Sequence, residues 1–240
     1  MQHLAVGTRN MLSSFCFDKR SAAHARRRLA RVWVGCGLAA LVQLGVPVRA
    51  QGVTDSEIVI GQSGQLSGPL AALSAEVRQG AKLHFDQVNA SGGVAGRKIR
   101  VVALDDAYDP KRASANTREL IDQHKVLALF QYAGTPPAMA AVPIAEEKQV
   151  PLISPFTGSD ALRQKFSRYV FNIKASYGDE LTAIVRQLAA VGIDRVAVVY
   201  LNNAFGTGGL AMVEKAAAQT RVQLLAKEPL EVDGANMDQA

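Results

Sequence analysis

The sequence predicts an α/β fold with parallel sheets from residue 57 onward. Short runs rich in β-branched residues alternate with longer stretches whose apolar residues recur at helical spacing. Glycine or proline stands between most of these runs, where a strand would turn into a helix. Alternating strands and helices form βαβ units, whose strands lie parallel. The composition fits a folded chain, since 48% of the residues are hydrophobic and 20% are charged.

In the first half of this region, four strands and three helices are predicted in strict alternation. Residues 71–89 place apolar side chains at helical spacing, and a glycine pair shortly beyond them suits the end of a helix. Asp109 is the expected N-cap of the second helix, with Pro110 in its first turn and an end near residue 125. The third helix should cover residues 135–148. The strands are predicted at residues 58–61, 99–104, 127–130 and 151–154.

The periodicity weakens between residues 154 and 177, and we place the crossing between two lobes there. Beyond it, the apolar run at 195–200 predicts a buried strand of a parallel sheet. The pattern stops without closing, so we expect a second lobe that is incomplete and a chain that is C-terminally truncated. The other elements are predicted as helices at 161–166, 179–191 and 208–219, strands at 169–172 and 223–226, and a first helical turn at 236–240.

Residues 1–50 are predicted to be an export signal with an N-terminal extension. A basic cluster at 26–31 precedes an apolar run at 32–48, and Ala50 ends a Val-Arg-Ala sequence of the kind that signal peptidase cleaves. The apolar run falls short of the ~20 residues that a spanning helix needs. We therefore expect cleavage after Ala50 and no membrane span in the mature protein.

The formal net charge of +6 comes from the same N-terminal part. Its 50 residues hold eight of the 27 basic residues and one of the 21 acidic residues, which leaves a net charge of −1 on the rest of the chain. A basic surface for nucleic acid or for an anionic membrane is therefore not expected.

Thiol and cofactor chemistry are not expected beyond residue 50. Both cysteines, Cys16 and Cys36, precede that point, which excludes a disulfide, a catalytic thiol and a cysteine-bound zinc from the remainder. The two histidines of the remainder, His84 and His124, fall on predicted helices without a matching Ser or Cys motif, and we interpret both as solvated. No phosphate loop or dinucleotide fingerprint follows a strand, so we expect neither a metal nor a cofactor.

An enzymatic function is not predicted. Residues 61–65 approach the pattern of a nucleophile elbow, but Gln65 stands where that motif needs glycine. Asp105, Asp106 and Asp109 could supply paired catalytic carboxylates or metal ligands. Because Asp109 is the expected cap of a helix, we interpret this cluster as structural.

Five segments, in order and at matching spacing, carry a resemblance to a known family. They cover residues 57–240, and this part of the chain resembles the periplasmic binding proteins of branched-chain amino-acid ABC transporters, the family of the leucine/isoleucine/valine-binding protein. Each segment alone is a weak signal, whereas the five together are specific. They are IGQSGQLSGP at 60–69, VNASGGVAG at 88–96, DDAYDP at 105–110, VPLISP at 150–155 and YLNNAFGTGG at 200–209.

The resemblance implies a periplasmic-binding-protein type I fold, in which two doubly wound lobes with parallel sheets close on a ligand in a hinge motion. The expected parts are the signal and extension at 1–50, lobe I at 51–175 and a partial lobe II at 176–240. The implied function is a periplasmic receptor that delivers a small carboxylate ligand to the permease complex of an ABC importer. Two alternatives stay open: a ligand-sensing module of a signalling system, and a fragment without function.

The resemblance also assigns a ligand carboxylate to the loops that follow the third and fourth strands. Helix N-termini at the carboxyl ends of parallel strands offer amides and the positive end of a dipole to an anion. A second interpretation stays open, because Thr135 and Ser159 could simply cap the helices that follow them. The predicted ligand contacts in these loops are Gly134, Thr135, Thr157, Gly158 and Ser159.

Two aromatic residues of the second lobe complete the predicted site. Tyr177 stands just after the crossing, where the family faces its cleft. Phe205 matches a cleft aromatic that is commonly tyrosine, and Leu73 stands where the family often has an aromatic. These departures make the pocket more apolar. The resemblance therefore leaves the ligand open between a branched-chain or other amino acid and an aromatic or other organic acid.

Overall fold

The computed structural model describes residues 50–238. All of the predicted export signal and extension except Ala50 lies outside the described residues, and so do both cysteines. Within the described part, none of the helices combines the length and the apolar character that crossing a membrane requires.

A five-stranded parallel sheet organises the first part of the chain. The strand order is β2-β1-β3-β4-β5, so the chain moves outward from β1 in both directions and reverses between β1 and β3. In doubly wound sheets, ligands bind beyond the carboxyl ends of the strands at such a reversal. The strands are β1 (Glu57–Gly64), β2 (Lys98–Asp105), β3 (Ala128–Phe130), β4 (Leu152–Ile153) and β5 (Val170–Phe171).

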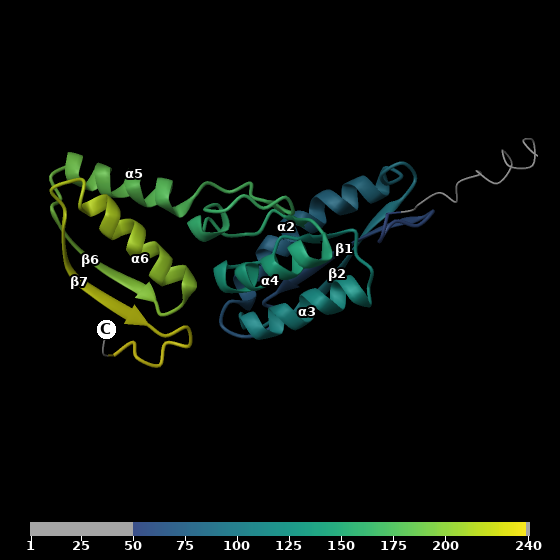
Figure 1. Cartoon of the computed structure of the whole chain (residues 1–240), viewed down its shortest axis with the longest axis horizontal. Coiled ribbons are helices and arrows are strands. Elements are labelled where there is room, and N and C mark those ends of the chain that lie inside the picture. The colour runs from purple at the N-terminus through teal and green to yellow at the C-terminus, as the bar shows by residue number, and fades with distance from the viewer. Residues whose placement is uncertain (1–49, 239–240) are drawn as a thin grey trace, which may run out of the picture. The chain divides into compact units, whose positions relative to one another are not determined.

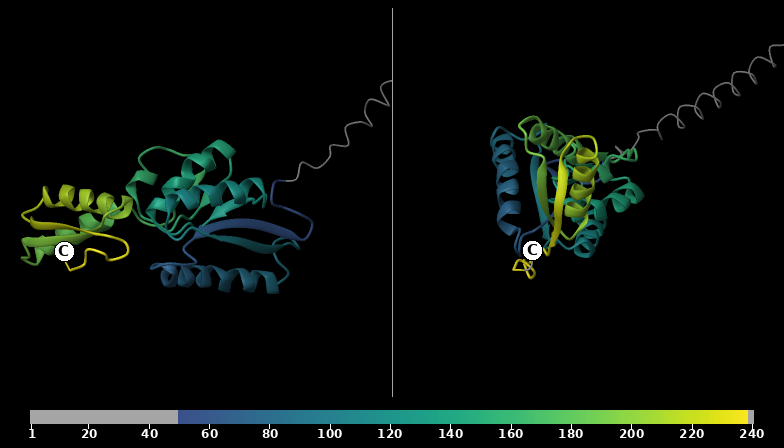
Figure 2. Two further views of the ribbon diagram at one scale, coloured as in Figure 1. Left: turned by 90° about the horizontal axis from the view of Figure 1, so that it is seen from below. Right: turned by 90° about the vertical axis from the view of Figure 1, so that its left-hand side faces the viewer.

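Helices cover both faces of this sheet. Figure 2 shows α3 (Pro110–Asp122) and α4 (Thr135–Lys148) on one face and α2 (Ala71–Ala90) on the other. The main core lies under α3 and α4, where Leu120 of α3 and Leu129 of β3 are fully buried. Each buried leucine contributes about 1.5–3 kcal/mol. This core fixes the end of β3, and thereby the start of α4, on which the site is built.

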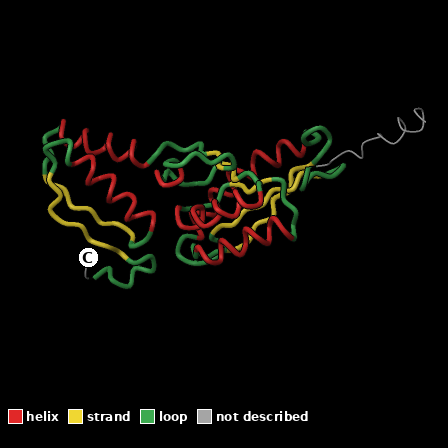
Figure 3. The backbone as a smooth tube through the Cα atoms, viewed as in Figure 1, coloured by secondary structure: helices red, strands yellow, loops and turns green. Residues whose placement is uncertain are grey.

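A separate two-stranded sheet follows, with β6 (Arg195–Leu201) parallel to β7 (Gln223–Leu230). Figures 1 and 3 show α5 (Tyr177–Ala190) and α6 (Ala204–Ala217) side by side on one face of it. The prediction that β6 is buried is wrong. Alternate side chains of β6 are exposed, as Val199 is at 61%, because α5 and α6 pack on one face only.

The α/β architecture with parallel sheets is confirmed, and the helix predicted at 135–148 has these bounds. The helix predicted to end near residue 125 ends earlier, because Lys125 adopts a left-handed φ of 51°. His124 therefore lies beyond α3, although it is exposed as expected. The helix predicted at 161–166 is a single 3₁₀ turn at Asp160–Leu162.

Two other boundaries differ from the prediction at the end of the described chain. The helix predicted at 208–219 begins four residues earlier, since Asn203 accepts hydrogen bonds from the amides of Phe205 and Gly206 and caps it. Residues 236–238 form turns rather than helix, because the Asn236 side chain bonds back to the Pro229 carbonyl and the Glu231 amide.

Candidate functional site

Two loops come together where β3 and β4 end. Ala133 and Phe156 form a parallel bridge between the loops. The Phe156 amide donates to the Tyr132 carbonyl over 2.8 Å, and the Gly134 amide donates to the Phe156 carbonyl over 3.2 Å. The sheet thus continues for one step past its last residues and fixes both loops at its carboxyl edge.

The side chains of Thr135 and Thr157 join these loops. Their hydroxyl oxygens lie 2.7 Å apart, and the Ser159 amide donates to the Thr157 hydroxyl over 3.2 Å. Both threonines are fully buried. The hydroxyls therefore hold the two loops together.

Neither Thr135 nor Ser159 acts as a side-chain cap. The N-cap of α4 is Gly134, and Thr135 is the first helical residue. Ser159 precedes the 3₁₀ turn, but within the described chain its side chain makes no capping hydrogen bond. The interpretation of these two residues as simple helix caps is therefore wrong.

The start of α4 offers few amide donors. Pro136 and Pro137 have no N–H, and the Ala138 amide bonds to the Gly134 carbonyl over 3.2 Å. An anion near this helix end would be attracted by the positive end of the helix dipole, while Thr135 itself is fully buried. This helix end therefore offers a ligand fewer amide donors than an ordinary helix N-terminus does.

A cavity of about 340 Å³ lies beside these loops. Ser159, Tyr177 and Phe205 line it, whereas Gly134, Thr135, Thr157 and Gly158 do not, so the structure brings together three of the seven predicted ligand contacts. The Tyr177 and Phe205 rings meet edge to face, with centroids 5.5 Å apart. The Lys174 ammonium lies over the Tyr177 ring, 5.1 Å from its centroid, and this cation–π contact also restrains the ring.

Gly158 provides the space for this aromatic wall. A Cβ at Gly158 would lie 2.7 Å from the Ala175 carbonyl oxygen and from Tyr177 Cδ1. The Tyr177 amide also donates to the Gly158 carbonyl over 2.7 Å. Any side chain at this position would push Tyr177 away from the loop. Leu73, in contrast, lies half-exposed on α2 and does not line the cavity.

Sequence reasoning missed Asp160, which lines the same cavity. Its carboxylate accepts a hydrogen bond from the Gly178 amide over 2.9 Å and so ties the 3₁₀ turn to the start of α5. Its position next to Ser159 was the available signal. The Asp160 carboxylate can pair with a cationic group of a ligand. The site predicted from the sequence contained no such acidic residue.

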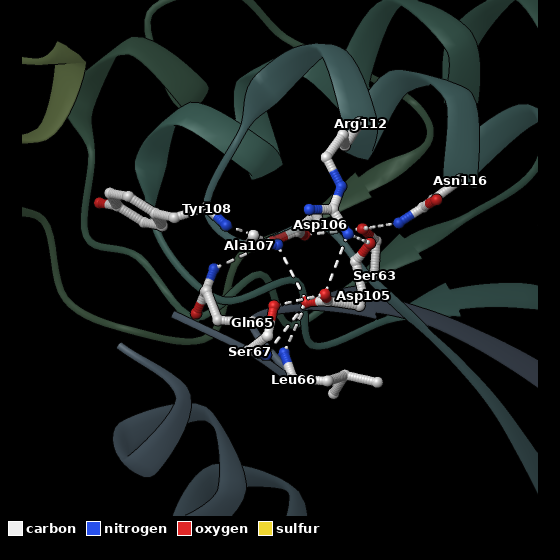
Figure 4. A network of polar contacts seen from close by, with 10 residues as sticks. All are labelled: Ser63, Gln65, Leu66, Ser67, Asp105, Asp106, Ala107, Tyr108, Arg112 and Asn116. Carbon is white, nitrogen blue, oxygen red and sulfur yellow. Dashed lines mark hydrogen bonds and ion pairs between the residues drawn. The ribbon is translucent and has the colours of Figure 1, made fainter. Parts of the chain in front are cut away.

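Asp105 ends β2, Asp106 follows it, and both carboxylates are held by protein donors, as Figure 4 shows. Asp105 accepts from the amides of Leu66 and Ser67, from the Ser67 hydroxyl over 2.6 Å and from Arg112. The Ser67 hydrogen bond, followed by those of the amides, lowers the Asp105 pKa below its ordinary value despite some desolvation. Its charge therefore secures the loop after β1.

Asp106 is fully buried beneath it. Its carboxylate accepts from the Ser63 hydroxyl over 2.7 Å, from the Tyr108 amide over 2.9 Å and from the Gln65 side chain over 3.4 Å. Burial raises the Asp106 pKa, and these hydrogen bonds oppose the rise. The cluster is a structural network, with Asp109 capping α3 through the Lys111 amide.

Comparisons with known proteins agree with this architecture. The sequence profile of the periplasmic binding protein family matches residues 57–240. The Leu/Ile/Val-binding protein homolog 8 of Brucella abortus (strain 2308) is 27% identical over 189 residues, which cover 75% of this chain and 46% of that protein.

Solved structures are similar as well. A possible leucine/isoleucine/valine-binding protein from Rhodopirellula baltica SH 1 has a TM-score of 0.66 and 32% identity, with 78% of this chain and 50% of that chain covered. A substrate-binding periplasmic protein from Ralstonia solanacearum has a TM-score of 0.72 and 30% identity, with 76% and 52% covered. The chain spans about half the length of the relatives it matches.

Proposed function

Since the chain belongs to the periplasmic binding protein family, we propose that it is a periplasmic receptor that binds a small carboxylate-bearing molecule and delivers it to an ABC importer. The cavity beside the carboxyl ends of β3 and β4 is the observation that carries this proposal. It combines the Ser159 hydroxyl with the aromatic wall of Tyr177 and Phe205. A ligand with a polar head and an apolar body fits such a lining.

These contacts distinguish between possible head groups of the ligand. The positive dipole end of α4, whose residue Met139 lines the cavity, favours a carboxylate, while the Asp160 carboxylate favours an ammonium group next to it. An α-amino acid has both groups. An aromatic acid such as benzoate would use the carboxylate contacts and the aromatic wall and leave Asp160 without a cationic partner.

A thermal-shift screen of the purified protein tests the proposal. We expect L-leucine and other apolar amino acids to raise the melting temperature, because a ligand that binds only the folded state stabilises it by mass action. In the Asp160→Asn variant the shift with L-leucine should shrink, while any shift with benzoate should persist. Stabilisation by sugars or metal cations alone, with no response to any acid, would contradict a carboxylate receptor.

Substitutions at Ser159 and Thr157 separate ligand contact from loop stability. Ser159→Ala should weaken binding of the stabilising acid by about 1 kcal/mol or more with little change in melting temperature. Thr157→Val should lower the melting temperature as well as the affinity, since it breaks the hydrogen bond with Thr135. Isothermal titration calorimetry and thermal unfolding give the two quantities. An unchanged affinity in Ser159→Ala would remove this hydroxyl from the site.

A further inference from the structure

Tyr108 occupies a strained turn directly after the carboxylate network. Its φ is 69°, and that of Ala107 before it is 46°, in the left-handed region that residues other than glycine rarely adopt. Hydrogen bonds hold this conformation: the Ala107 amide donates to Asp105 over 3.0 Å and the Tyr108 amide donates to Asp106. Figure 4 shows the Tyr108 side chain directed away from both carboxylates. The strained backbone at Tyr108 thus directs its ring away from the two carboxylates.

The ring lies against the turn that begins α4. A Cβ built on Gly134 would lie 2.3 Å from Tyr108 Cε2 and 3.2 Å from the phenol oxygen, so the ring packs directly on the Gly134 backbone. Gly134 itself has φ 92° and ψ 157°, a conformation that is essentially restricted to glycine. Tyr108 therefore covers the residue that precedes the Thr135 amide.

The phenol lies near the side chain of Asn203, the residue between β6 and α6. The Asn203 carboxamide oxygen caps α6, which fixes the direction of the amide nitrogen. That nitrogen is buried and has no hydrogen-bond partner within residues 50–238. Burial, with lesser effects of Tyr177 and Asp106, raises the Tyr108 pKa to about 12, and the Asn203 side chain opposes the rise. The phenol thus stays neutral beside a donor that lacks an acceptor.

We propose that Tyr108 is a positioning residue of the ligand site: its ring fixes the Gly134 turn, and its phenol oxygen accepts the hydrogen bond of Asn203. This pair, which we call the Tyr108–Asn203 latch, ties the helix that carries Phe205 to the turn that carries the Thr135 amide. The role in ligand binding rests on the proposed function. A ligand held from both sides leaves only when the latch opens, so the latch sets the rate of release.

The first test uses no ligand. We expect hydrogen exchange of the α6 first-turn amides to be at least about threefold faster in Tyr108→Phe than in the unchanged protein, because the cap residue loses its acceptor. Tyr169→Phe is the matched control, since it removes another half-buried phenol that lies outside the latch. Equal exchange in Tyr108→Phe and the unchanged protein would overturn the latch whether or not any acid binds.

The second test measures release of L-leucine and of benzoate by stopped flow. Tyr108→Phe and Asn203→Ser, whose serine still caps α6, should each raise the dissociation rate about fivefold, the effect of one neutral hydrogen bond, with unchanged association rates. The double variant should release no faster than either single variant. Additive effects, or effects on association alone, would overturn the latch. If neither acid binds the unchanged protein, the proposed function fails while the exchange experiment still decides the latch.

Discussion

Asp106→Ala should lower the free energy of unfolding by about 3 kcal/mol. The Ser63 hydroxyl and the Tyr108 amide would lose a buried acceptor at 2.7 and 2.9 Å. The turn at Ala107 and Tyr108, held at positive φ, would lose one of its anchors. Urea unfolding followed by circular dichroism measures this free energy. Asp109→Ala is the control, because it removes an exposed helix cap and should cost about 1 kcal/mol.

The pH dependence of stability tests the same carboxyl through Asp106→Asn. A group whose pKa is raised in the folded state stabilises the fold fully below its unfolded pKa and loses that contribution as the pH rises through the folded pKa. For Asp106 the starting point is the ordinary value of 3.8. The stability of the unchanged protein relative to Asp106→Asn should therefore fall as the pH rises from about 4. A relative stability that rises over this range would contradict the raised pKa.

Gly134→Ala should destabilise the protein by about 2–3 kcal/mol and weaken binding of the stabilising acid at least tenfold. The new methyl group would lie 2.3 Å from Tyr108 Cε2, and the backbone conformation at φ 92° excludes a side chain even without that collision. Tyr108 or the turn must move, and the start of α4, whose Met139 lines the cavity, moves with it. Chemical unfolding and calorimetry measure the two effects.

Two further variants separate the causes. Gly96→Ala has a comparable φ of 80° with no atom near the new Cβ, so it reports backbone strain alone and should leave binding unchanged. Adding Tyr108→Ala to Gly134→Ala removes the collision and should restore part of the lost stability. If Gly134→Ala behaves like Gly96→Ala in both assays, the Tyr108 ring does not fix the turn.

Local patterns predicted those elements that local interactions define. The helix at Thr135–Lys148 has its predicted bounds because a glycine with positive φ precedes it and a left-handed Gln149 follows it. The Asp109 cap with Pro110 was equally visible in the sequence. The exposure of one face of β6 could not be predicted, because an apolar run looks the same whether one face of a strand is covered or both.

The candidate site divides in the same way. The loops after β3 and β4 were predicted to act together, because parallel strands end at one edge of a sheet. The sequence could not show that the hydroxyls of Thr135 and Thr157 form a hydrogen bond with each other, nor that Asp160 lines the cavity. These outcomes depend on side-chain directions that are set by packing between segments distant in the sequence.

The α/β class, the order of strands and helices and the family resemblance can all be read from the sequence, because periodicity, caps and glycine turns act over a few residues. Which polar groups are accessible to a ligand depends on contacts between distant segments, which the sequence does not show. Tyr108 illustrates the reason: its neighbours Gly134 and Asn203 are 26 and 95 positions away. Only the folded sheet, with the strained turn after β2, brings the three residues together.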